Sequence, residues 1–209
     1  MPELPDVTVY VEALARRVQG VTLRSALVRS PFVLRTVDPP LESAEGRRVR
    51  GVERLGKRIV LALEGGLFLV NHLMIAGRLR WFDGAPAGMG KIELARFTFE
   101  TGTLCLTEAG TTRRASIHLI AGRAALAAMD PGGLEVLRST GAAFGERLTR
   151  ENRTLKRVLT DPALFSGIGN AYSDEILRAA GLSPIRLTRS LDGAEVQRLH
   201  SAAIRVLET

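Results

Sequence analysis

The sequence predicts an α+β protein in which a leading helix and a β-sandwich, residues 1–129, precede a helical domain, residues 130–209. Three features indicate this. Apolar residues at helical spacing open the chain, short apolar runs separated by glycines fill residues 22–120, and the pattern turns helical after residue 133. The turn-forming run Asp130-Pro131-Gly132-Gly133 separates the two patterns and places the domain boundary near Met129.

The leading helix is predicted over residues 4–19. Its apolar positions Val7, Val11, Leu14 and Val18 fall on one helical face, and Gly20 follows as a stop signal. Pro5 suits the first turn, where its missing N–H group has no intrahelical partner to lose.

Short β-type runs follow the helix, and their number and spacing favour a sandwich or a barrel. We adopt the sandwich. The predicted strands span residues 22–29, 47–54, 59–63, 67–73, 79–82, 93–99, 104–107 and 116–120, with a glycine-rich loop at residues 84–90.

Helices are predicted over residues 154–159 and 170–180, with Gly181 as the C-cap of the second. Asp192 and Glu195 have the spacing of a capping box and predict a further helix beginning there.

Composition favours a polyanionic partner. The formal net charge is +7 and the pI is near 10.6, which favours nucleic acid over a membrane, although a basic ribosomal or merely arginine-rich protein has the same balance. Cys105 is alone and the three histidines are scattered, so no zinc ligand set can be assembled. With no signal peptide and no apolar run long enough to span a membrane, we expect a cytoplasmic, nucleoid-associated monomer.

The start of the chain carries a chemically suggestive pair. If Met1 is removed, Pro2 becomes a secondary amine with the carboxylate of Glu3 beside it. A terminal amine titrates near ~8, so part of it is unprotonated at neutral pH and attacks electrophilic carbon, while Glu3 moves protons. The alternative is an ordinary proline-rich chain start.

A second segment, Gly167-Ile168-Gly169-Asn170, leads into a predicted helix. The first N–H groups of a helix lack intrahelical partners, and two glycines permit close approach of a phosphate, with Asn170 as a further donor. A mononucleotide-binding turn is the rival interpretation, but no third glycine follows at fingerprint spacing and no strand precedes the segment.

Together, these two segments resemble the formamidopyrimidine-DNA glycosylase and endonuclease VIII family of base-excision repair enzymes. The resemblance runs over essentially the whole chain. It implies that Pro2 is the nucleophile, that Glu3 is the acid/base, and that the glycine-rich segment, including Gly169, is the hairpin of a helix–two-turn–helix DNA-binding domain.

The resemblance also assigns contacts to the DNA backbone. Lys57, in the turn Leu55-Gly56-Lys57-Arg58, matches the lysine that holds the phosphate beside the lesion; the alternative is a solvated hairpin lysine. Lys156 matches a phosphate contact or is an ordinary exposed helix lysine. His72 matches a histidine near the backbone or is an interior histidine.

Several positions depart from the family pattern. Ile75 stands where a methionine fills the gap left by the flipped-out base, so an apolar wedge is retained. Arg113 matches the arginine that pairs with the orphaned base, while Ala115 replaces an aromatic wedge. Asp6 replaces a glutamate, and Glu175 fits the family pattern as a residue that helps to hold the chain start.

The implied activity is that of a bifunctional DNA glycosylase and abasic-site lyase acting on damaged double-stranded or bubble DNA without a metal or organic cofactor. Family members usually continue into a four-cysteine zinc finger, which we expect this chain to lack; zinc would enter only with a finger beyond the given sequence. Two alternatives remain: a catalytically silent relative that binds damaged DNA, and a binder of structured RNA.

Overall fold

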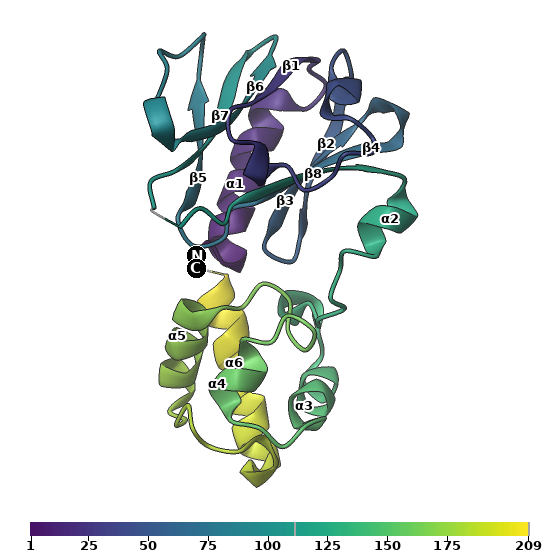
Figure 1. Ribbon diagram of the computed structural model, residues 1–209. Coiled ribbons are helices and arrows are strands. Elements are labelled where there is room, and N and C mark those ends of the chain that lie inside the picture. Colours follow the sequence, from purple (N-terminus) through teal and green to yellow (C-terminus); the bar gives the residue numbers. More distant parts are fainter. Residues whose placement is uncertain (111, 209) are drawn as a thin grey trace. The chain divides into compact units, whose positions relative to one another are not determined.

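The computed structural model describes residues 1–110 and 112–208, and its contacts divide the chain into two units (Figure 1). The first unit comprises Met1–Pro2 and Asp6–Met129, and the second comprises Glu3–Pro5 and the chain from Asp130 onward. The three residues that follow Pro2 are therefore packed with a segment more than a hundred residues away in sequence.

The first unit is a β-sandwich, as predicted. One antiparallel sheet has the order β1–β6–β7–β5, and the other has the order β2–β3–β4–β8. The strands are β1 (Leu23–Val28), β2 (Val49–Leu55), β3 (Arg58–Leu63), β4 (Leu67–His72), β5 (Gly77–Phe82), β6 (Glu93–Phe99), β7 (Gly102–Glu108) and β8 (Ser116–Ala121). The predicted strands are all present, with ends that shift by no more than two residues.

The main core of this unit lies between the two sheets and the leading helix α1 (Leu4–Val18). Val7, Leu14 and Val18 of α1 are buried there, which confirms the helical spacing read from the sequence. Strand β3 alternates: Ile59 and Leu61 enter this core, whereas Val60 joins a second cluster beneath α2 (Arg123–Ala127) on the other face of the sheet. The short helix α2 was not predicted, because only Leu126 marks its buried side.

The second unit is helical and contains α3 (Gly141–Thr149), α4 (Leu155–Leu159), α5 (Asn170–Ala180) and α6 (Gly193–Leu207), of which α3 was not predicted. Gly181 ends α5 in the left-handed conformation, and Asp192 and Glu195 form the predicted capping box. Leu4 is buried in the core of this unit, not with the rest of α1. Short 3-10 turns lie at Pro31–Val33, Leu41–Ala44, Glu64–Gly66, Gly90–Ile92, Val136–Arg138 and Thr188–Ser190.

Neither a membrane span nor a metal centre is found in the part of the chain that the structure describes. No helix there is both long and apolar enough to cross a membrane, and no three His, Cys, Asp or Glu side chains are grouped to hold a metal ion. Cys105 is a buried free thiol in β7, as expected.

Candidate active site and nucleic-acid interface

The carboxylate of Glu3 is fixed at the beginning of α5. Its side chain is buried, and its Oε2 accepts the backbone N–H groups of Gly169 at 2.6 Å and Tyr172 at 3.1 Å, while Oε1 accepts that of Ala171 at 3.0 Å. The N–H of Leu4 donates to the carbonyl of Gly167 at 2.9 Å. A negative charge at a helix N-terminus is stabilised by the unpaired N–H groups and by the helix dipole. Glu3 and Leu4 are thereby held in one position within the helical unit.

This arrangement adds a second use of the glycine-rich turn to the expected one. The N–H groups around the start of α5 lack intrahelical partners, as predicted, but three of them bind Glu3 and do not await a phosphate. The contact between Gly169 and DNA stays a prediction, and in this structure the Gly169 N–H donates to Glu3. Asn170 is exposed, so its side chain remains suitable for a phosphate contact.

Gly167 lets the N-terminal segment approach the turn. It has a φ of +79°, and a Cβ at this position would lie 2.8 Å from the Cβ of Leu4. Only glycine combines this conformation with such a close approach. Gly167 thus makes room for Leu4, a role that local sequence reasoning missed.

Lys156 and Asp174 form an ion pair in the helical unit. The Nζ atom of Lys156 lies 2.7 Å from Oδ1 and 2.6 Å from Oδ2 of Asp174, and both side chains are partly exposed. Asp174 is four residues beyond Asn170, so the two residues share one face of α5. The lysine expected to contact a phosphate is therefore already paired with a carboxylate.

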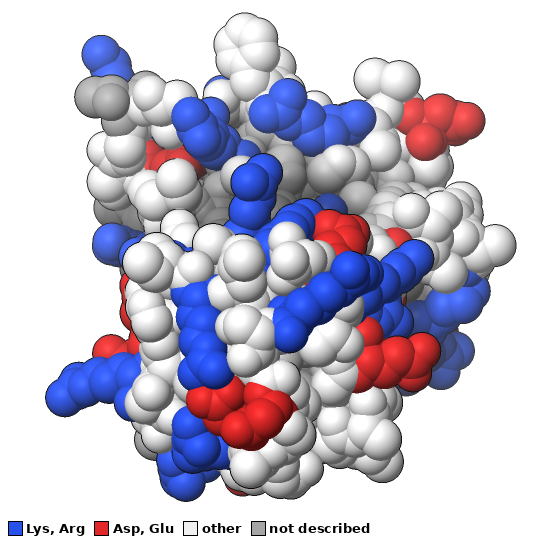
Figure 2. Space-filling view, turned by 90° about the horizontal axis from the view of Figure 1, so that it is seen from below, with Lys and Arg blue, Asp and Glu red and all other residues white. Residues whose placement is uncertain are grey.

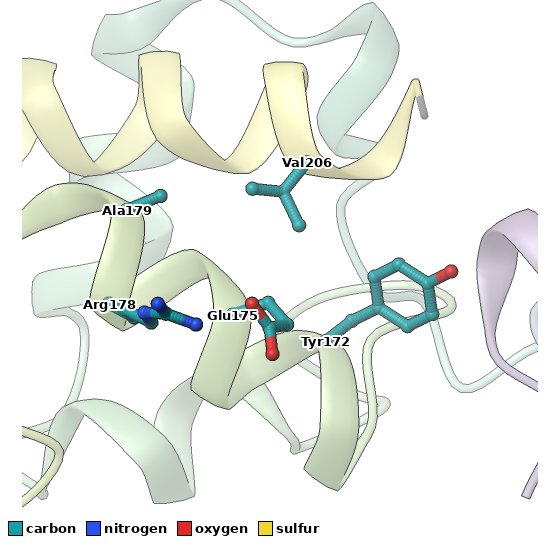
Figure 3. Close-up of a pocket in the computed structure, with 5 residues that line it drawn as sticks. All are labelled: Tyr172, Glu175, Arg178, Ala179 and Val206. Carbon is teal, nitrogen blue, oxygen red and sulfur yellow. The ribbon is translucent and has the colours of Figure 1, made fainter.

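Glu175 lines an open pocket of about 550 Å³ with Tyr172, Arg178 and Ala179 of α5 and Val206 of α6 (Figure 3). Figure 3 shows the side chain of Val206 extending from α6 toward α5, with Glu175 next to Arg178. The expected role of Glu175 in holding the chain start stays a prediction.

In the sandwich unit, Lys57 occupies the two-residue turn between β2 and β3. Leu55 pairs with Arg58 across this turn, and Gly56 takes a φ of +58° that suits glycine. Lys57 is half-buried at the end of the hairpin.

His72 ends β4, where it pairs in register with Arg58 of β3. Burial, helped by the positive charges of Arg58 and Lys57 and by His118, lowers the pKa of His72 to about 4. His72 is therefore neutral at physiological pH, so it offers a phosphate a hydrogen bond but no charge.

Ile75 and the segment before β8 share a cavity in the sandwich unit. Ile75 is 58% exposed and lines a cavity of about 290 Å³ with Glu108 and Arg114 among other residues. The buried carboxylate of Glu108 accepts the N–H groups of Arg114 at 2.9 Å and Ala115 at 3.0 Å. This carboxylate holds the arginine-bearing segment in place, a role that the sequence analysis missed and that a lone glutamate at a strand end did not reveal.

Arg113 is exposed and donates to the carbonyl of Lys91 at 2.5 Å. Ala115 behaves differently: it is 3% exposed and belongs to the sandwich core. A larger side chain at position 115 would enter the core, so this position does not present a wedge. Asp6, expected to support the site, is exposed in the first turn of α1.

Charged side chains of both signs lie on the surface drawn in Figure 2. Lys and Arg side chains are interleaved there with Asp and Glu. Local pairing, such as that of Lys156 with Asp174, therefore affects which cations are available to an anionic partner.

Two family models match this chain: the formamidopyrimidine-DNA glycosylase N-terminal domain over residues 1–115 and the formamidopyrimidine-DNA glycosylase H2TH domain over residues 133–209. The formamidopyrimidine-DNA glycosylase of Thermus thermophilus is 36% identical over 213 residues, covering 99% of this chain and 74% of the relative. The formamidopyrimidine-DNA glycosylase of Pelobacter propionicus is 34% identical over 221 residues, covering 100% of this chain and 78% of the relative.

Solved structures agree with these matches. The crystal structure of the MutM (Fpg) protein from Thermus thermophilus superposes with a TM-score of 0.84 at 34% identity, covering 99% of this chain and 75% of that one. Lactococcus lactis formamidopyrimidine-DNA glycosylase, non-covalently bound to DNA containing an AP site, gives a TM-score of 0.89 at 25% identity, covering 99% and 80%. The similarity thus extends over both units of the chain.

Proposed function

The chain belongs to the formamidopyrimidine-DNA glycosylase family of base-excision repair enzymes, and from that premise we propose that it releases damaged bases through a Schiff base on Pro2. The observation that carries this proposal is the clamp on Glu3. Its three hydrogen bonds to the start of α5 hold the residue that follows Pro2 in a fixed position. Such preorganisation speeds attack by a nucleophile, because the entropic cost of orienting the nucleophile is met before the substrate binds.

The proposed reaction begins with loss of Met1, which frees the secondary amine of Pro2. The Pro2 nitrogen attacks C1′ of the damaged nucleotide, the C1′–N bond to the base breaks, and the nitrogen lone pair gives an iminium ion as the sugar ring opens. The proton that the Pro2 nitrogen loses after the attack passes to the Glu3 carboxylate, which delivers it to the ring oxygen as this oxygen leaves C1′. Elimination of the 3′ phosphate then nicks the strand, and hydrolysis of the imine returns the amine.

The proposed DNA contacts come from both units. Lys57, Lys156 and Arg113 supply positive charge, whereas His72 and Asn170 supply neutral hydrogen bonds to the backbone. Ile75, exposed beside the Glu108 cavity, is the apolar wedge that enters the stack when the base flips out.

We propose damaged double-stranded or bubble DNA as the substrate of a monomer that acts at the nucleoid and needs no metal or organic cofactor within this chain. Ile75 is β-branched and stiff, and Ala115 presents no aromatic group. Base extrusion should therefore be best supported where little unstacking energy is required, as in bubbles and mismatches. The name of the relatives makes formamidopyrimidine the first lesion to test.

Borohydride trapping on an abasic-site duplex tests the nucleophile. The wild-type protein should form a covalent adduct whose intact mass lacks Met1, and Pro2→Gly should lower the yield at least tenfold. Pro5→Ala, which changes a proline in the first turn of the same helix, is the matched control and should still be trapped. An adduct that retains Met1, or equal trapping by Pro2→Gly, would refute the mechanism.

Salt dependence tests the proposed phosphate contact of Lys57. The logarithm of the affinity should fall linearly with the logarithm of salt concentration, and Lys57→Ala should flatten that slope by about one unit. Lys91→Ala removes another lysine from the same unit, which makes it an informative comparison. An unchanged slope for Lys57→Ala would remove Lys57 from the phosphate contacts.

A further inference from the structure

Lys156 is held by both oxygens of one carboxylate. Its ammonium lies 2.7 Å and 2.6 Å from the two Oδ atoms of Asp174, which begins the second turn of α5. The side chains are 36% and 55% exposed, so an incoming phosphate can reach the pair from solvent. Asp174 shares its helix face with Asn170, the other proposed phosphate contact of this unit.

The start of α5 contributes less to phosphate binding than an ordinary helix N-terminus, because Glu3 has already taken the N–H groups of residues 169, 171 and 172. The charge that attracts a phosphate to this hairpin must therefore come from a side chain. Lys156, one residue into α4, is the cation placed beside this face of α5, and Asp174 neutralises it.

From this geometry we propose that Asp174 is an intramolecular competitor for the DNA phosphate that binds Lys156. This inference rests on the proposed function, since it concerns the DNA affinity of the same enzyme. A phosphate that takes Lys156 displaces the Asp174 carboxylate, which is left beside a second negative charge. Asp174 thereby limits how tightly the helical unit holds any DNA backbone, damaged or not.

The competition has a thermodynamic signature. A phosphate that binds a free lysine releases a counterion from the DNA, which steepens the salt dependence by about 0.9 for each contact with a duplex. When the lysine is first freed from Asp174, the liberated carboxylate takes up a cation from solution. This cation uptake offsets the counterion release from the DNA, so the Lys156 contact adds almost nothing to the salt slope of the wild-type protein.

Asp174→Asn should expose this hidden contact. We expect an undamaged duplex to bind about threefold to fivefold more tightly at low salt, in line with the strength of an exposed ion pair, and the slope to steepen by about 0.9. Fluorescence anisotropy over a series of potassium chloride concentrations measures both quantities. Asp174→Asn should have no such effect in a Lys156→Met background, where the cation is already gone.

Glu64→Gln is the matched control. It also removes one negative charge from a partly exposed ion pair, in which Oε1 of Glu64 lies 2.5 Å from a guanidinium nitrogen of Arg50. Glu64 follows the end of β3 that is farther from the Lys57 turn. Melting curves of the variants establish that each remains folded at the assay temperature.

Three results would overturn the proposal: an Asp174→Asn effect no larger than that of Glu64→Gln, an effect that persists with Lys156→Met, or weaker binding by Asp174→Asn. The last result would mean that Asp174 positions Lys156 instead of competing for it. Borohydride trapping of the wild-type protein separates this failure from failure of the proposed function. Trapping that succeeds while Asp174→Asn behaves like the control would refute only the competition.

Discussion

Replacing Glu3 with glutamine tests the clamp at the start of α5. At best, the amide oxygen of the new side chain replaces Oε2 and keeps the bonds from Gly169 and Tyr172, while its NH₂ group then faces the N–H of Ala171, which is 3.0 Å from Oε1 in the wild-type protein. The variant leaves the NH₂ group of its buried side chain without an acceptor, at a cost of about 1–3 kcal/mol. It also loses the interaction of a charge with the helix dipole, worth about 1 kcal/mol.

The expected loss is therefore about 3 kcal/mol of unfolding free energy, or roughly 6–12 °C in the thermal midpoint for a chain of this size. Circular dichroism at neutral pH measures the midpoint. Glu12→Gln makes the same chemical change at an exposed position of α1, where about 0.5 kcal/mol or less is expected. If Glu3→Gln melts within the range of Glu12→Gln, the clamp does not stabilise the protein and the reasoning is refuted.

Further outcomes are expected at three other positions. Gly167→Ala should cost about 2–4 kcal/mol and sharply reduce imine trapping, because its Cβ would lie 2.8 Å from the Cβ of Leu4 at a φ of +79°; a normal melting curve would contradict this. The pKa of His72 is lowered from 6.5 to about 4, so stability present above pH 6.5 should fall by up to about 2 kcal/mol as the pH drops toward 4. Denaturant titrations at several pH values should show a smaller fall in unfolding free energy for His72→Gln than for the wild-type protein. An equal fall in the variant would mean that another group causes the pH dependence. Ala115→Phe should overpack the core and lower the unfolding free energy by about 1–3 kcal/mol. It should not raise the single-turnover rate on paired duplex relative to the rate on a bubble. A selective gain in rate on paired duplex would show that the side chain at position 115 reaches the DNA.

Much of the fold could be predicted from the sequence because its patterns are local. The helical spacing from Val7 to Val18 identified the buried face of α1, and Asp192 and Glu195 form the capping box that their spacing indicated. Strand positions followed from glycine-bounded apolar runs. The helices α2 and α3 were missed, because α2 has one buried apolar residue and α3 begins with a glycine and two alanines.

The candidate site, like the fold, could be predicted from the sequence only where its features are local. Pro2 and Glu3 were identifiable because a secondary amine next to a carboxylate is chemically distinctive whatever the fold. The sequence also identified the turn before α5 as a place where N–H groups seek an anion. It could not indicate that the anion is Glu3 itself, because that bond joins residues more than 160 positions apart.

Tertiary structure alone decided how the charged groups are used. It paired Lys156 with Asp174, brought the Glu108 carboxylate to the N–H groups of Arg114 and Ala115, and buried Ala115 in the core. Residue types and local spacing determine which segments form helices and strands and which side chains are reactive. Which donor meets which acceptor depends on packing between distant segments, and a hydrogen bond or ion pair contributes only when that packing brings its partners within about 3 Å.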